Sequence, residues 1–88
     1  MTGLKGIYTI YDRKGEIYFP PFMETADGTA VRKMQDMVAE KGSIWAAHPA
    51  DFDLVKIGEF GEISGTIKPI RDKEVLTNLG SLVQTTGE

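Results

Sequence analysis

The first run of apolar residues extends from Leu4 to Asp12, and its side chains alternate between two faces that both carry apolar groups. β-Branched and aromatic residues dominate this run, as is typical of a β-strand. Because neither face is purely polar, we expect the strand to be covered on both sides or to lie near an interface. One face holds Leu4, Tyr8 and Ile10, and the other holds Lys5, Ile7, Thr9 and Tyr11.

A turn is predicted from Asp12 to Gly15, because aspartate favours the first position of a turn and glycine the last. The segment from Glu16 to Phe19 then returns as a short second strand, which completes a hairpin. Pro20 and Pro21 end it, since proline cannot donate a hydrogen bond to a strand ladder. We expect the stretch from Phe22 to Thr25 to be a connection.

The clearest pattern along the chain predicts a helix from Gly28 to Lys41. Apolar residues recur there at helical spacing and form a stripe that would face a core. Asp27 is a suitable N-cap, and Gly42 is suitable just beyond the C-terminus. The apolar stripe consists of Ala30, Val31, Met34, Met37 and Val38.

The second half of the chain again favours strands. The segment from Ser43 to Ala47 is open between a helix end, a short strand and a packed loop. A single helical turn is predicted from His48 to Phe52, with proline in its first turn. The second long strand runs from Asp53 to Phe60, and a turn from Gly61 to Gly65 leads to a short partner strand from Thr66 to Ile70.

Apolar residues after the last strand recur at helix-like spacing, which predicts a short helix from Asp72 to Leu79. The polar segment from Gln84 to Glu88 is predicted to be a disordered tail. The order β-β-α-β-β, with a short C-terminal helix, predicts a single α+β domain over residues 1–83. One amphipathic helix would pack on one face of a small antiparallel sheet, and the tail or another subunit would cover the other face.

The composition limits the classes of partner, the stabilising bonds and the compartment that we expect. The 88 residues include ten Lys and Arg against thirteen Asp and Glu, a formal charge of −3, which argues against a basic surface for duplex DNA. The chain has no cysteine, so disulfides and cysteine-ligated zinc are excluded, and oligomerisation is the expected support for so small a core. Without an apolar run long enough for a membrane helix or a signal peptide, we expect a reducing cytoplasm and no membrane partner.

Catalytic or metal chemistry has little support in the sequence. His48, Asp51 and Asp53 form the only cluster of metal-ligating residue types, and a capped turn explains them better than a site built from one short segment. No serine stands in a triad or nucleophile-elbow signature, and no glycine run matches a phosphate loop. We therefore expect no metal, no cofactor and no catalytic residue, and the chain is not expected to be an enzyme.

The predicted hairpin combines aromatic and basic residues, which together can form a stacking platform for single-stranded nucleic acid. The alternative is that the tyrosines fill the core or an interface, as aromatic residues usually do. Arg71 and Lys73, beside the last predicted strand, are interpreted as ordinary solvated residues. The candidate binding residues are Lys5, Tyr8, Tyr11, Arg13, Lys14 and Tyr18.

Several short motifs resemble a known family. The block from His48 to Phe60 reads HPADFDLVKIGEF, and it follows a Tyr-Asp pair at Tyr11, a Pro-Pro-Phe connection ending at Phe22, and an Ala-Val-Arg helix start at Ala30. In this order the motifs resemble the small nonstructural proteins of gokushoviruses, Microviridae with circular single-stranded DNA genomes. The resemblance covers about residues 7 to 62. This chain has Ala47 and Gly61 where the family often has lysine and aspartate.

The resemblance implies a non-enzymatic phage protein, expressed in the cytoplasm of a bacterial host, that binds DNA or acts in viral single-stranded DNA synthesis. It transfers no active-site residues. Two hypotheses follow. In the first, the chain binds single-stranded DNA through the hairpin as a homo-oligomer, in viral DNA synthesis or packaging. In the second, favoured by the acidic charge balance, it is an interaction or assembly factor for a viral replication or capsid protein or a host factor, without nucleic-acid affinity.

Overall fold

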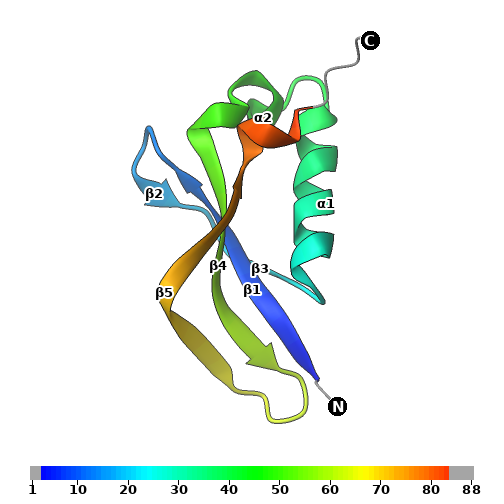
Figure 1. Ribbon diagram of the computed structural model, residues 1–88, viewed down its shortest axis with the longest axis vertical. Helices are drawn as coiled ribbons and strands as arrows, with labels where there is room; N and C mark the ends of the chain where they lie inside the picture. The colour runs from blue at the N-terminus through cyan, green and yellow to red at the C-terminus, as the bar shows by residue number, and fades with distance from the viewer. Residues whose placement is uncertain (1–2, 84–88) are drawn as a thin grey trace.

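The computed structural model describes residues 3–83 and shows an antiparallel sheet with one main helix lying along one face (Figure 1). The sheet order is β2-β1-β4-β5, and β3 also pairs with β1. This arrangement confirms the predicted α+β class. The strands are β1 (Leu4–Asp12), β2 (Ile17–Tyr18), β3 (Phe22–Glu24), β4 (Phe52–Gly61) and β5 (Ile67–Asn78); the helices are α1 (Asp27–Ala39) and α2 (Ile44–Ala47), with 3-10 turns at Pro49–Asp51 and Leu79–Leu82.

Strand β1 lies at the centre of the sheet. It pairs with β2 and β3 along one edge and with β4 along the other, over nearly its whole length. Residues 6–10 are all buried, so both faces of the strand are covered, as the sequence predicted. One face packs against α1 through Tyr8 and Ile10, while Ile7 and Thr9 are buried on the other.

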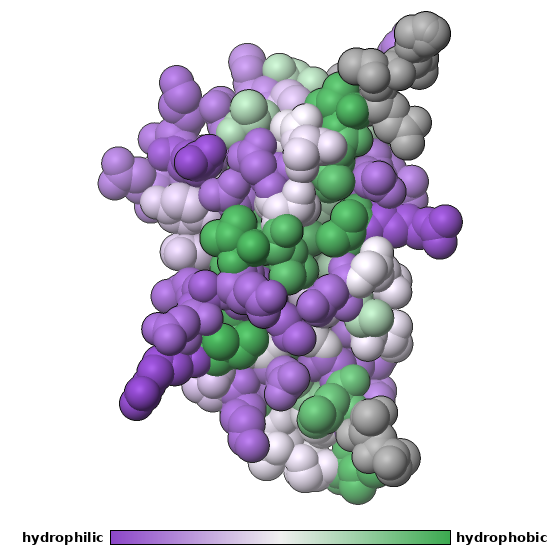
Figure 2. Space-filling model, viewed as in Figure 1, coloured by the Kyte–Doolittle hydropathy of each residue, from purple (hydrophilic) through white to green (hydrophobic). Residues whose placement is uncertain are grey.

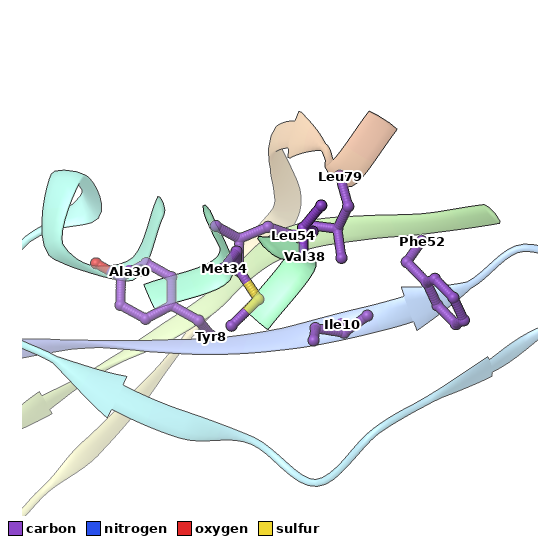
Figure 3. Close-up of a cluster of buried hydrophobic side chains, with 8 residues drawn as sticks. All are labelled: Tyr8, Ile10, Ala30, Met34, Val38, Phe52, Leu54 and Leu79. Carbon is purple, nitrogen blue, oxygen red and sulfur yellow. The ribbon is translucent and has the colours of Figure 1, made fainter. Parts of the chain in front are cut away.

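The main core lies between α1 and the sheet (Figure 3). The predicted helix stripe is confirmed, because Ala30, Met34 and Val38 are its buried residues. An edge-to-face aromatic group closes the core at one end, with Trp45 at 5.1 Å from Phe19 and 4.8 Å from Phe52 between ring centroids. The buried cluster comprises Tyr8, Ile10, Ala30, Met34, Val38, Phe52, Leu54 and Leu79.

The start of α1 is tied to the middle of β1 by one buried side chain. The Tyr8 ring lies over Gly6, where a Cβ atom would overlap with the phenol group. This placement brings the Tyr8 hydroxyl within 2.6 Å of Asp27 Oδ1, to which it donates. Lys56 on β4 reaches the same carboxylate at 3.4 Å. An aromatic ring over a strand glycine is a known way of filling the gap that the glycine leaves.

The C-terminal helix predicted from Asp72 to Leu79 is wrong. These residues continue β5 and pair with β4, for example Val75 with Val55. The spacing of the apolar residues in this segment is compatible with the period of a helix and with that of a strand. Pairing with the long neighbouring strand β4 favours the strand. The last apolar side chain, Leu79, is buried from a 3-10 turn rather than from a helix.

Three further predictions need correction. Residues 22–24, predicted as part of a connection, form β3 and pair with β1, because Phe22 packs against the core beside Tyr8. The N-cap of α1 is Ala26, and Asp27 lies in the first turn, where its carboxylate accepts from Tyr8 instead of capping the helix. The helix ends at Ala39, so the predicted Gly42 falls beyond its C-cap.

The ambiguous segment from Ser43 to Ala47 forms α2, and Ser43 caps it by accepting from the Ala46 amide at 3.0 Å. The predicted single turn after His48 is confirmed as a 3-10 turn. Residues 84–88, for which the sequence predicts disorder, lie outside the described residues. No helix within residues 3–83 is both long and apolar enough to cross a membrane.

A substitution at Gly6 tests the packing of Tyr8. Gly6→Ala should lower the free energy of unfolding by about 2–4 kcal/mol, because the added methyl displaces the phenol ring and breaks its hydrogen bond. The matched control is Gly28→Ala in α1, where a methyl group meets no atom within 4 Å. The control should change stability by less than about 1 kcal/mol. Urea unfolding measures both, and equal effects would contradict this packing.

Candidate nucleic-acid interface

Tyr8 does not belong to a surface. Its side chain is fully buried between the sheet and α1, and its hydroxyl is engaged by Asp27. A nucleobase cannot stack on a ring that is covered on both sides. For this residue the alternative interpretation of the hairpin tyrosines, a place in the core, is therefore the correct one.

Tyr11 and Tyr18 do form a pair at the surface, in which Tyr18 is exposed and Tyr11 is partly buried. They are directly opposite each other in the β1–β2 ladder, with ring centroids 4.6 Å apart at an interplanar angle of 43°. Because Ile10 points to α1, the neighbouring Tyr11 projects from the opposite face of the sheet. Tyr18 is 47% exposed. The pair thus offers aromatic surface to solvent on the sheet face that α1 leaves open.

Lys73 joins this pair from β5. Its Nζ atom lies 5.8 Å from the centroid of the Tyr18 ring, within cation–π range. In the β4–β5 ladder, residues 70–73 stand opposite the single residue Ile57, so β5 arches outward there. Figure 1 shows β5 crossing in front of β4. The sequence analysis interpreted Lys73 as an ordinary solvated residue beside the last predicted strand, because the cross-strand contact with Tyr18 leaves no local pattern.

Two other cations lie at the same end of the hairpin. Arg13 is largely exposed, and its Nε atom is 3.6 Å from Asp53 Oδ2. Lys14 is exposed in the β1–β2 turn, which Asp12 stabilises by accepting from the backbone amides of residues 14 and 15 at 3.0 and 3.1 Å. The predicted turn is therefore confirmed, and it holds two cations beside the aromatic pair.

Lys5 lies apart from this group. It is six residues before Tyr11 on the same strand, which separates their backbones by about 20 Å. Its ammonium group pairs with Glu62 Oε2 at 3.5 Å. Of the six predicted residues, the structure therefore brings together Tyr11, Arg13, Lys14 and Tyr18, and leaves out Tyr8 and Lys5.

The two faces of the sheet differ in charge. The ladder places Glu24, Glu59 and Glu74 on the side that carries Tyr8 and α1. On the open face Asp53 is a strand carboxylate, and both of its oxygens are engaged, by Asn78 at 2.8 Å and by Arg13. Figure 2 shows apolar side chains in the middle of the visible surface, where β5 crosses β4, with hydrophilic ones around them.

The segment around His48 has structural roles. His48 caps both α2 and the following 3-10 turn, and Asp53 takes part in the contacts just described. Within residues 3–83, no group of three His, Cys, Asp or Glu side chains is arranged to hold a metal ion.

Comparison with known proteins gives one match. The family model described as "Phage ORF5 protein" matches residues 5–82. No curated protein and no solved structure matches the chain.

The pair that holds α1 in place also gives the fold a dependence on pH. Burial, and then the hydrogen bond to Asp27, raise the pKa of Tyr8 far above its ordinary value near 10. The same hydrogen bond lowers the pKa of Asp27 below its ordinary value. The folded state thus holds the Tyr8 proton more tightly than the unfolded chain does. The part of the stability due to Tyr8 is complete below about pH 10 and is lost as pH rises further, whereas the part due to Asp27 is complete above about pH 4 and is lost as pH falls.

Tyr8→Phe should cost about 1–3 kcal/mol of unfolding free energy at neutral pH, because Asp27 loses its donor. It should also remove the part of the alkaline loss of stability that Tyr8 causes. Tyr18→Phe is the matched control and should keep both properties. Urea unfolding at pH 7 and above pH 10 makes the comparison. A Tyr8→Phe protein that loses stability above pH 10 as steeply as the unsubstituted chain would contradict this assignment.

Proposed function

Because the chain belongs to the phage ORF5 protein family, we propose that it is a non-enzymatic phage protein that binds single-stranded DNA on the sheet face opposite α1. The proposed setting is a gokushovirus infection, in the cytoplasm of the bacterial host. There the protein acts as a homo-oligomer in viral DNA synthesis or packaging.

The cluster of Tyr11, Tyr18 and Lys73 is the observation that carries this proposal. Stacking of a base on an exposed aromatic ring contributes about 1–3 kcal/mol and tolerates every base. A cation beside the ring places positive charge where the phosphate of a stacked nucleotide passes. Three residues from three strands thus supply both kinds of contact that an unstructured DNA strand needs.

Arg13 and Lys14 extend the proposed contact to the hairpin turn, and Lys5 supports a longer path along β1. Sites on single-stranded DNA span roughly 4–16 nucleotides, so one bound strand can reach from the turn toward Lys5. The net charge of −3 does not oppose this proposal, because the strand carboxylates gather mainly on the α1 side.

A second candidate function is binding of another protein, such as a viral replication or capsid protein. Exposed apolar side chains on β3 and β5 favour it, among them Met23, Ile67 and Val75. Exposed apolar side chains rimmed by polar residues can mark a protein-binding site. This function predicts no affinity for DNA even at low salt, which separates it from the first proposal.

The test is a titration of labelled oligo-dT with the protein, followed by fluorescence anisotropy at about 50 and 200 mM salt. Tyr18→Ala should weaken binding by about 5- to 150-fold, whereas Tyr18→Phe should retain it, because the ring provides the stacking energy. Lys73→Gln should lower the slope of log affinity against log salt by about 0.7, the value for one phosphate contact on a single strand.

Lys41→Gln is the matched control for charge, since Lys41 is an exposed lysine beyond the end of α1. It should leave the salt slope unchanged. No binding by folded protein at the lower salt would refute an intrinsic DNA activity and favour the protein-binding role. If Lys73→Gln and Lys41→Gln lowered the salt slope equally, the DNA contact would not be specific to the open face.

A further inference from the structure

The turn between β4 and β5 presents an exposed apolar side chain on a rigid support. Ile63 is 79% exposed, the most of any large apolar side chain within residues 3–83. The turn is closed by hydrogen bonds from the Gly61 amide to Thr66 O at 2.8 Å and from the Gly65 amide to Gly61 O at 2.7 Å. Glu62 stands next to Ile63. We call Glu62 and Ile63 the tip; Figure 1 shows this turn at the lower end of the molecule.

An apolar pocket of about 200 Å³ lies between α1 and the segment of residues 19–22. Small-molecule sites usually start near 300 Å³, whereas an apolar cavity of about 150 Å³ already holds benzene. The pocket therefore has the size for one hydrophobic side chain. Its walls include Phe19, Pro20, Phe22, Met37 and Trp45.

The edge of this pocket carries a cation, which favours an incoming segment that contains a carboxylate. Among the described residues that line it, Lys33 alone is charged. Its side chain is half-exposed, and its ammonium group lies 3.7 Å from Glu24 Oε2 and 4.8 Å from the centroid of the Phe22 ring. An apolar side chain that enters beside Lys33 is favoured when its neighbour is a carboxylate. Exposed apolar side chains follow a glutamate at Ile17, Ile63 and Val75, and Ile63 in the tip is the most exposed of the three.

We infer that the tip of one copy of this chain inserts into the pocket of a second copy, with Ile63 among the aromatic rings and Glu62 beside Lys33. Glu62 would exchange its exposed partner Lys5 for Lys33 of the partner subunit. Tip and pocket are different surfaces, and each copy carries one of each. The contact can therefore repeat from copy to copy and place several subunits along one strand.

This contact specifies the homo-oligomer of the proposed function, but it does not require DNA to form. One inserted side chain makes an interface at the small, weak end of the known range. Successive copies bound to the same DNA strand would gain from their high local concentration. We therefore expect weak self-association of the free protein and cooperative binding on long DNA.

The single tryptophan of the chain, Trp45, lies in the pocket and reports its occupancy. ¹⁵N-labelled Ile63→Ser protein keeps its pocket and lacks a tip, whereas unlabelled Lys33→Glu protein keeps its tip and has an impaired pocket. Adding the second to the first should shift the indole N–H resonance of Trp45. Adding an unlabelled Ile63→Ser/Lys33→Glu protein should not, and the tip substitution should weaken the contact at least tenfold.

The matched control is an unlabelled Ile17→Ser/Lys33→Glu protein. It has lost an exposed isoleucine on β2 but keeps its tip. Adding it should still shift the Trp45 indole resonance. An unchanged indole signal with the Lys33→Glu donor at millimolar concentration, or equal shifts with all donors, would overturn the inference. DNA binding is scored separately on an oligonucleotide of about 10 nucleotides, within one site size. Ile63→Ser should bind it normally, so failure of the contact and failure of the DNA proposal are distinguishable.

Discussion

The hydrogen bond between Tyr8 and Asp27 sets the position of α1 on the sheet. It forms only because Gly6 has no side chain, which leaves room for the phenol ring to lie back along its own strand. The same carboxylate receives Lys56 from β4, so the start of the helix is held to two neighbouring strands. A small domain without disulfides depends on such contacts, since its core alone contributes little excess stability.

With α1 fixed on one side, the other face of the sheet carries no helix within residues 3–83 near Tyr11 and Tyr18, although Ile7 and Thr9 are buried further along β1 on that face. The alternation of side chains along β1 then separates two roles within one strand: Tyr8 and Ile10 fill the core, and Tyr11 lies at the surface beside Tyr18. The outward arch of β5 adds Lys73 to that pair. An acidic protein can in this way present an aromatic and basic surface, because most of its strand carboxylates face the helix side.

The sequence correctly predicted those elements that are determined by patterns over a few neighbouring residues. Strand β1, the hairpin turn at Asp12 and the buried stripe of α1 are confirmed, because alternation, turn chemistry and helical spacing each act over a few residues. The end of β5 was predicted wrongly, since its conformation depends on pairing with β4, about twenty residues earlier in the chain. Lys73, interpreted from the sequence as an ordinary solvated residue, lies beside Tyr18 in the structure. Likewise, Tyr8 could be separated from Tyr11 and Tyr18 only once the position of α1 was known.

We propose that single-stranded DNA lies on the sheet face opposite α1, and mapping of backbone amide shifts would locate the contact residue by residue. ¹⁵N-labelled protein is titrated with oligo-dT at low salt. We expect the largest shifts on residues 11–18 and on the arch of residues 70–75, while the exposed side of α1 stays unchanged. Shifts centred on α1, or none at saturating DNA, would contradict it.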